Sequence, residues 1–222
     1  TWQICNERCL TLFLPKPVTL EQQQLCWGLA EKIPQLDDIK AWIKETVVGM
    51  NTLSVYTQDL TARQLLQLQY FLQTISHDSQ FIKKIDGRHI EIPVRYGGEY
   101  GPDLLDLAQQ KNMTVRELVE RHTAPIYTVY FMGFQPGFPY LGGLSPELYS
   151  PRHAVPRLQV PAGSVGIGGE QTGIYPFASP GGWQLLGRTE LPLFNLKNEQ
   201  PTLLQAGDTL SFVAIDVIKE RL

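Results

Sequence analysis

Glycine and proline dominate one long stretch of this chain, from Gly133 to Thr189, and restrict what it can fold into. Twelve of the 19 glycines in the sequence lie between Gly133 and Gly187. Glycine permits positive φ angles and close backbone approach, whereas proline fixes φ and removes a backbone donor. A helix is therefore excluded here, and the regular aromatic and polar residues argue against a flexible linker. We expect tight strands and ordered loops that shape a pocket or a partner surface.

The overall composition is ordinary for a soluble globular protein. Of the 222 residues, 43% are apolar and 18% are charged, and the formal net charge is −3. No run of Lys and Arg provides a footprint for nucleic acid or for an anionic membrane surface. No apolar run reaches the length of about 18 residues that a membrane-spanning helix needs. We therefore expect neither a nucleic-acid partner nor a membrane.

The three cysteines, Cys5, Cys9 and Cys26, do not form a metal-binding pattern. Their number is odd, and no nearby histidine or second cysteine pair completes a zinc site. The four histidines are also far apart in the sequence, so we expect no metal site. Reduced, buried thiols and the absence of a signal-peptide layout predict a cytoplasmic protein.

Residues 1–86 are predicted to form a small α+β domain. Apolar residues alternate in the expected strands and recur at helical spacing in the expected helices. The order is strand, helix, strand, strand, helix, strand, which is the ferredoxin-like βαββαβ arrangement. A polar segment at 76–87 marks the expected domain boundary. The predicted elements are strand 8–14, helix 20–33, strand 39–43, strand 52–57, helix 61–75 and strand 89–94, the last leading into the second domain.

Residues 87–222 are predicted to form a β-barrel domain. A short helix is expected at 103–110, and Thr114 with Glu117 forms a capping box for a second helix. From a strand at 126–131 onward, short β segments separated by glycine and proline continue to Phe212. Many short strands with glycine-rich turns are typical of a small barrel.

The glycine-rich run from Gly163 to Gly169 does not have the form of a phosphate-binding loop. It lacks the Gly-x-x-x-x-Gly-Lys-Ser/Thr order, and no helical pattern follows to supply a helix dipole. Ser164 also lies outside a Gly-x-Ser-x-Gly nucleophile elbow. We interpret Ser164 as a turn serine, and we keep it as a candidate substrate-binding residue.

Two interpretations of His122 stay open. It lies at the end of a predicted helix, where a cation interacts favourably with the helix dipole, and it continues the apolar face of Val115 and Leu118. A structural histidine at a helix end is one interpretation. The other is a catalytic histidine that faces a pocket formed by residues 133–140.

Arg157 is a candidate for binding a small acid. It comes three residues before the apolar Val160-Pro161-Ala162, and a guanidinium presents paired donors that match a carboxylate. The alternative is a structural arginine that holds loop carbonyls. Neutral hydrogen-bonding groups that suit the same small polar ligand are Gln135, Tyr140, Gln171 and Tyr175.

Longer motifs place the chain near one known family. Over Ile92 to Phe212 it resembles the allophanate hydrolase subunit 1 family. That family includes one component of ATP-dependent 5-oxoprolinase, its B subunit, together with the Kip inhibitor of a sporulation histidine kinase and one part of the carboxyltransferase region of urea carboxylase. The matching blocks are Ile92-Pro93-Val94, Tyr96-Gly97-Gly98, Gly101-Pro102-Asp103-Leu104, the block from Gly133 to Leu144 and the block from Arg157 to Thr189.

The resemblance implies a cyclophilin-like β-barrel and a function within a complex. In 5-oxoprolinase this component works with subunits A and C to open 5-oxoproline to L-glutamate with ATP hydrolysis, so the resemblance implies an amide hydrolase subunit that is inactive alone. It further implies that ATP binds mainly on a partner or at a shared interface. In that setting Arg157 would engage a carboxylate or phosphate, and His122 and residues 135–140 would line a shared pocket. A histidine kinase inhibitor and a carboxyltransferase component of urea or allophanate degradation remain as alternatives.

Overall fold

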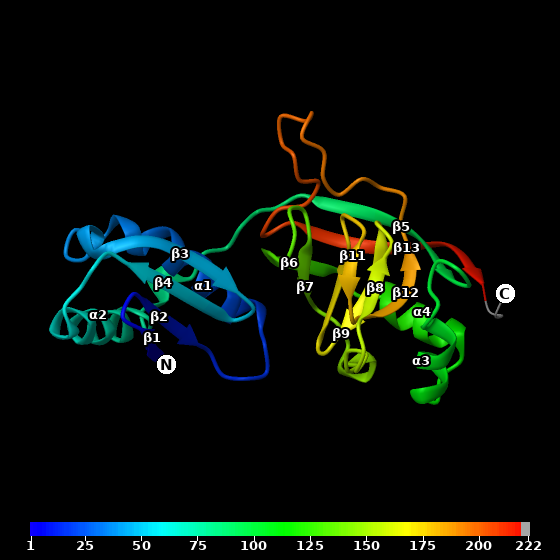
Figure 1. Ribbon diagram of the computed structural model, residues 1–222, viewed down its shortest axis with the longest axis horizontal. Coiled ribbons are helices and arrows are strands. Elements are labelled where there is room, and N and C mark those ends of the chain that lie inside the picture. Colours follow the sequence, from blue (N-terminus) through cyan, green and yellow to red (C-terminus); the bar gives the residue numbers. More distant parts are fainter. Residues whose placement is uncertain (219–222) are drawn as a thin grey trace. The chain divides into compact units, whose positions relative to one another are not determined.

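The computed structural model describes residues 1–218 and divides into two compact units (Figure 1). The first unit is Thr1–Ile85, and the second begins at Asp86. Each unit has its own apolar core. The two are therefore described separately.

The first unit is a four-stranded antiparallel sheet with strand order β1-β2-β4-β3, packed against two helices. Leu10 and Leu12 of β2 alternate with Thr11, so the two leucines enter the core, while Thr11 contacts Ser54 of β4. This alternation gives the sheet one apolar face, which the helices cover. The elements are β1 (Trp2–Asn6), β2 (Cys9–Phe13), α1 (Leu20–Lys32), η1 (Ile33–Gln35), η2 (Lys40–Trp42), β3 (Ile43–Gly49), β4 (Thr52–Thr57), α2 (Ala62–Ile75) and η3 (Ser79–Phe81).

The order of elements in this unit is ββαββα, which corrects the predicted βαββαβ arrangement. An additional strand, β1, precedes β2 and pairs with it. The predicted last strand belongs to the barrel instead. Residues 40–42 form a short 3-10 turn, and β3 begins only at Ile43, so the strand predicted at 39–43 is also wrong. The strand β1 gives no alternation signal because Trp2 is its one buried residue; its indole donates to Ser76 Oγ at 2.7 Å.

The second unit is a closed barrel of seven strands in the order β10-β7-β6-β13-β5-β12-β9. Its pairs are antiparallel except β13 with β5, which run parallel. The mixed α+β class and the predicted barrel are thus confirmed. The elements are β5 (His89–Gly97), α3 (Leu104–Gln110), α4 (Val115–Thr123), β6 (Tyr127–Met132), β7 (Pro139–Gly142), η4 (Pro146–Leu148), β8 (Arg157–Val160), β9 (Ser164–Gly168), β10 (Gln171–Ile174), β11 (Ser179–Gly181), β12 (Gln184–Arg188) and β13 (Thr209–Ile218).

Two further features, a pair of helices and a two-stranded ribbon, lie outside the barrel wall. The helices α3 and α4 pack against the barrel, and α4 begins at the predicted capping box, in which Thr114 Oγ1 accepts from the Glu117 amide. The strands β8 and β11 form a separate two-stranded ribbon. Arg157 is the first residue of β8 in this ribbon, whose two strands are labelled in Figure 1.

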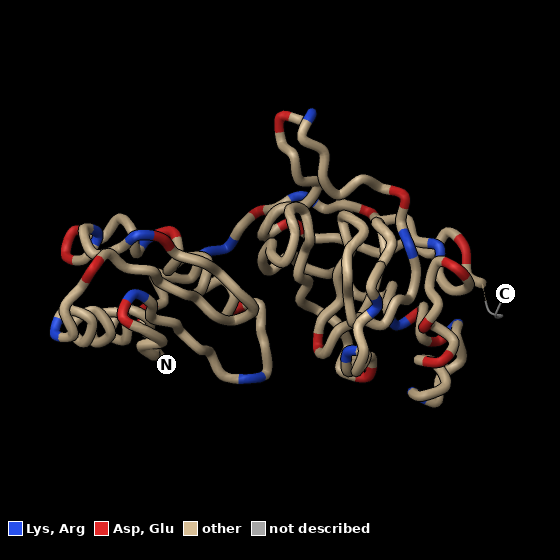
Figure 2. The backbone as a smooth tube through the Cα atoms, in the orientation of Figure 1, with Lys and Arg blue, Asp and Glu red and all other residues tan. Residues whose placement is uncertain are grey.

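Charge is spread over both units. Acidic and basic residues are interspersed along the backbone of both units (Figure 2), in keeping with the small net charge. No helix within residues 1–218 combines the length and apolar character that a membrane crossing requires. The same residues contain no group of three or more His, Cys, Asp and Glu side chains placed to hold a metal ion.

Candidate functional site

Four aromatic side chains pack together beside the barrel and form what we call the aromatic cluster: Phe138, Tyr140, Tyr175 and Trp183. The ring centroids of Phe138 lie 5.3 Å from Tyr175 and 5.4 Å from Trp183, in edge-to-face geometry. Such pairs are favoured over face-to-face stacking because ring edges and faces carry opposite partial charge. Phe138, Tyr175 and Trp183 are buried and Tyr140 packs against them, so the cluster is a small, well-packed aromatic core.

The glycines of the sequence motif make room for these rings. A Cβ atom on Gly168 would lie 2.3 Å from Trp183 Nε1, and one on Gly181 would lie 2.6 Å from the Tyr175 hydroxyl. Both distances are far below van der Waals contact, so only glycine fits. The glycine-rich run predicted as ordered loop or strand is in fact β9 and its flanks, and all of β9 is buried. Its packing role leaves no cradle for a phosphate group.

A charged group, which we call the Asp103 cluster, consists of Asp103, His153 and Arg157. Asp103 Oδ1 accepts from Arg157 Nη2 at 2.5 Å, and Oδ2 accepts from the Leu185 amide at 2.7 Å. His153 Nε2 lies 3.2 Å from Asp103 Oδ2, although the geometry is not that of a hydrogen bond. The acid thus joins the start of α3 to the ribbon and to β12.

The Asp103 cluster and the aromatic cluster adjoin each other. The His153 amide donates to the Gly182 carbonyl at 2.7 Å, directly before Trp183, and the Arg152 guanidinium lies 6.0 Å from the Trp183 ring centroid. Burial raises the pKa of Tyr175, while Arg152 and Arg157 act in the opposite direction. Two arginines and one aspartate make this region net positive, which favours an anionic ligand.

Several polar atoms in this region are buried without a hydrogen-bond partner among residues 1–218. They are Arg157 Nη1, His153 Nε2 and Gln135 Oε1. A buried donor or acceptor without a partner costs about 1–3 kcal/mol, so such atoms are rare in folded proteins. Donors on Arg157 and an acceptor on Gln135 are what a small ligand with a carboxylate and an N–H group would satisfy.

The loop between β6 and β7 is strained at the edge of the aromatic cluster. Phe134 has φ of 63°, a left-handed conformation that bulky residues rarely adopt. The residue is 61% exposed, and the centroid of its ring lies 5.4 Å from that of Phe138 and 6.2 Å from that of Tyr175, edge to face. Strained, exposed residues occur preferentially at ligand sites. Gln135 follows Phe134 in this loop, and Phe134 is the residue whose ring contacts the aromatic cluster.

His122 lies elsewhere, in the barrel core, where it is fully buried. Thr172 Oγ1 donates to the Gly166 carbonyl, so His122 Nε2–H donates to Thr172 Oγ1 at 2.9 Å. Nδ1 then accepts from the Tyr96 hydroxyl at 2.8 Å. Burial lowers the pKa of His122 from 6.5 to about 3, so the ring stays neutral. This arrangement supports the structural interpretation of His122 and separates it from the aromatic cluster.

The other predicted site residues lie either in the aromatic cluster or in the barrel strands β9 and β10. Tyr140 and Tyr175 belong to the aromatic cluster. Ser164 is a buried residue of β9, and its carbonyl accepts from the Tyr175 amide at 2.9 Å. Gln171 is a partly buried residue of β10 that pairs with Gly168. Among the predicted site residues, Tyr140 and Tyr175 share the aromatic cluster, and Arg157 pairs with Gly181 in the adjoining ribbon.

Sequence reasoning missed Asp103 and His153. An acid at the start of a helix is ordinarily solvated, and a histidine without a second ligand nearby has no pattern of its own. The signal that was present is composition: Arg152, His153 and Arg157 fall within six residues, the last of which is the first residue of β8. A dense local group of cations beside a glycine-rich, aromatic segment is the feature that points to a site for an anion.

The fold and the side chains described above define a barrel-domain protein in which the ion pair of Asp103 and Arg157 adjoins a buried aromatic cluster. Residues 1–204 match the family model described as "Carboxyltransferase domain, subdomain C and D". The chain belongs to this family, and the expected family resemblance is confirmed.

Named relatives cover nearly the whole chain. A protein of Haemophilus influenzae, named as the B subunit of 5-oxoprolinase, is 48% identical over 94% of this chain and 94% of its own length. An Escherichia coli O157:H7 protein with the same name is 44% identical, over 95% of this chain and 94% of its own length. The crystal structure of TTHA0988 superposes with a TM-score of 0.72 at 32% identity, covering 96% of this chain, which spans only 40% of that longer chain.

Proposed function

We propose that this chain is a B-type subunit of ATP-dependent 5-oxoprolinase, a cytoplasmic enzyme that opens 5-oxoproline to L-glutamate with ATP hydrolysis together with subunits A and C. The observation that carries the proposal is the name shared by two relatives at 48% and 44% identity, each aligned over at least nine-tenths of both chains. Substrate and partners are those that this name and the family resemblance imply.

The site chemistry supports this substrate. 5-Oxoproline is a small lactam with one carboxylate and one ring N–H. Arg157 offers a buried guanidinium nitrogen without a partner, and Gln135 offers an acceptor oxygen. We assign Arg157, with Arg152 nearby, to the substrate carboxylate, and Gln135 to the lactam N–H. The aromatic cluster would pack against the ring and exclude water, which strengthens these charged contacts.

The chain's own glycine-rich segment does not fit ATP. Strand β9 is buried in the barrel wall, and its glycines accommodate Trp183 and main-chain neighbours. The next element is another strand, β10, so no helix N-terminus follows β9 directly to bind phosphate oxygens. We therefore assign ATP mainly to a partner subunit or to a shared interface, and assign this chain to positioning the lactam substrate. The isolated chain is then inactive.

The test is reconstitution. The chain is purified alone and together with its A and C partners, and both 5-oxoproline-dependent release of phosphate from ATP and L-glutamate formation are measured. We expect turnover with all three proteins and none with the chain alone. A complete mixture without 5-oxoproline-dependent phosphate release would overturn the proposed function. Full turnover by the isolated chain would overturn the division of labour.

A further inference from the structure

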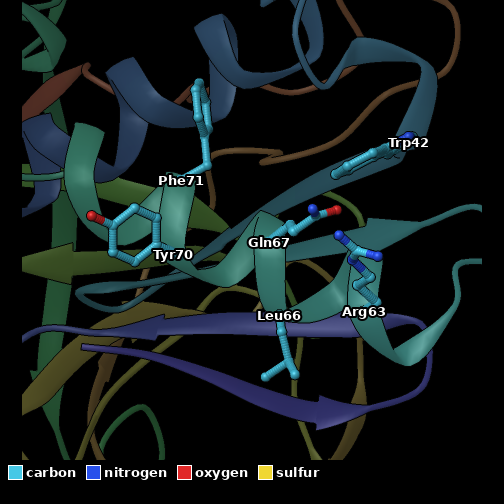
Figure 3. A pocket seen from close by; sticks show the side chains of 6 residues that line it. All are labelled: Trp42, Arg63, Leu66, Gln67, Tyr70 and Phe71. Carbon is cyan, nitrogen blue, oxygen red and sulfur yellow. The ribbon is translucent and has the colours of Figure 1, made fainter.

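A groove lies along the helix α2 in the first unit, far in sequence from the site described above. Its volume is about 740 Å³. Figure 3 shows its lining, which we call the α2 groove: Trp42 from the turn before β3, and Arg63, Leu66, Gln67, Tyr70 and Phe71 from α2.

The helix α2 has apolar residues on two sides. Leu65, Leu68 and Leu72 point into the core of the first unit and are buried. Leu66 and Tyr70, four residues apart and so on one face, are 60% and 77% exposed. The core accounts for the first set but not for the second. Exposed large apolar residues that line a groove are typical of a surface that another protein covers.

Charge identifies the kind of partner. Arg63 is the only charged residue in Ala62–Ile75. Its guanidinium has no ion pair or hydrogen bond within the part of the chain that the structure describes. Among the same residues, no acid lines the α2 groove. A second copy of this groove could not supply a carboxylate for Arg63, because it too contains none. A symmetric contact between two copies of this groove would leave both Arg63 side chains without a carboxylate, so an acidic surface of a different polypeptide complements the groove better.

We propose that the α2 groove binds an amphipathic helix of a partner polypeptide, with apolar side chains against Leu66, Tyr70 and Trp42 and a carboxylate paired with Arg63. The residues Arg63, Leu66 and Tyr70 recur at helical spacing along about 10 Å of α2, which matches two turns of a docked helix. The inference rests on the proposed function only in naming the partner, which is another subunit of the same enzyme.

The experiment measures binding directly. The full chain, labelled at a distant site, is titrated with each purified A and C subunit, and Kd is compared for wild type, Arg63→Glu, Leu66→Glu and Tyr70→Ala. We expect at least a tenfold rise in Kd for Leu66→Glu and Arg63→Glu with one of the two subunits. Leu196→Glu is the matched control, because Leu196 is 79% exposed and lies outside the α2 groove.

Site-specific photo-crosslinking completes the test. A photoreactive phenylalanine replaces Tyr70 in the assembled complex, and mass spectrometry locates the crosslinked segment. We expect a helical segment of a partner with an acid near the crosslink, and its Asp or Glu→Lys variant should restore binding to Arg63→Glu. Unchanged Kd for all three groove variants, or crosslinking only to a second copy of this chain, would overturn the proposal.

The two proposals fail separately. Groove variants that bind normally in a complex with full 5-oxoproline-dependent ATP hydrolysis would overturn the docking surface alone. A complex that assembles through Leu66 but does not hydrolyse ATP with 5-oxoproline would overturn the proposed function and support the docking surface.

Discussion

Arg157 Nη2 donates to Asp103 Oδ1 at 2.5 Å, across 54 residues of sequence. This contact ties the β8–β11 ribbon to the start of α3. The second carboxylate oxygen of Asp103 accepts from the Leu185 amide of β12. The Asp103 side chain therefore fixes the position of Arg157 relative to β12. The charge needed at the site is thus held in place by the fold itself.

Replacing Asp103 should destabilise the second unit. Asp103→Ala leaves the Leu185 amide and a partly buried guanidinium without their acceptor, because both oxygens are used. We expect a loss of about 2–4 kcal/mol in the free energy of unfolding, since removing one partner of a buried pair leaves an uncompensated charge. Urea denaturation measures it. Asp106→Ala, on the same helix, is the control, and an equal loss for both variants would contradict the assigned role.

Replacing Arg157 should weaken substrate binding in the assembled enzyme. Arg157→Lys keeps the charge but removes Nη1, the guanidinium nitrogen that is left for the substrate when Nη2 donates to Asp103. We expect KM for 5-oxoproline to rise about tenfold or more, which is about 1.4 kcal/mol or more of lost binding, with a smaller change in kcat. Steady-state phosphate release measures both. An unchanged KM would remove Arg157 from the substrate site.

The barrel was predictable because its signal is local. Glycine and proline separate short apolar runs, and their effect depends only on the backbone geometry at each position. The capping box at Thr114 and Glu117 needs only four residues. The predicted residues Arg157, Tyr140 and Tyr175 share one region for the same reason, because they lie in short segments that glycine and proline turns fold back on one another.

The errors come from contacts between distant residues. The strand β1 has only Trp2 buried; it is placed by its pairing with β2 and by the hydrogen bond from Trp2 to Ser76, 74 residues away. Asp103 and His153 have no mutual spacing in the sequence that marks them as neighbours. The βαββαβ prediction also assigned residues 89–94 to the first unit, whereas their pairing with β13 depends on the far end of the chain.

His122 should make stability depend on pH. Its pKa is about 3 in the folded protein and 6.5 when exposed, because burial disfavours the charged ring. Between these values the unfolded chain binds the additional proton, so this contribution to stability is complete above about pH 6.5 and is lost as pH falls toward 3. The slope approaches about 1.4 kcal/mol per pH unit. Urea denaturation at several pH values measures it.

The control is His122→Gln, which retains a donor and an acceptor but does not titrate. Carboxylates contribute equally to both proteins, so the difference in unfolding free energy between wild type and His122→Gln should shrink as pH is lowered. A difference that stays constant from pH 7 to pH 4 would contradict the buried, neutral state of His122.

A side chain at Gly168 should lower the free energy of unfolding, because it would collide with Trp183. A Cβ atom at Gly168 would lie 2.3 Å from Trp183 Nε1 and 2.4 Å from Cε2 of the same ring, so Gly168→Ala must displace an indole packed against Phe138 and Tyr175. We expect a loss of about 1–3 kcal/mol, typical of overpacking, and a change in the near-UV circular dichroism of the aromatic cluster. Gly182→Ala is the matched control: its Cβ would meet nothing closer than 3.6 Å, so it should stay within about 0.5 kcal/mol of wild type. If the two variants were equally stable, packing against Trp183 would not explain the glycine in β9.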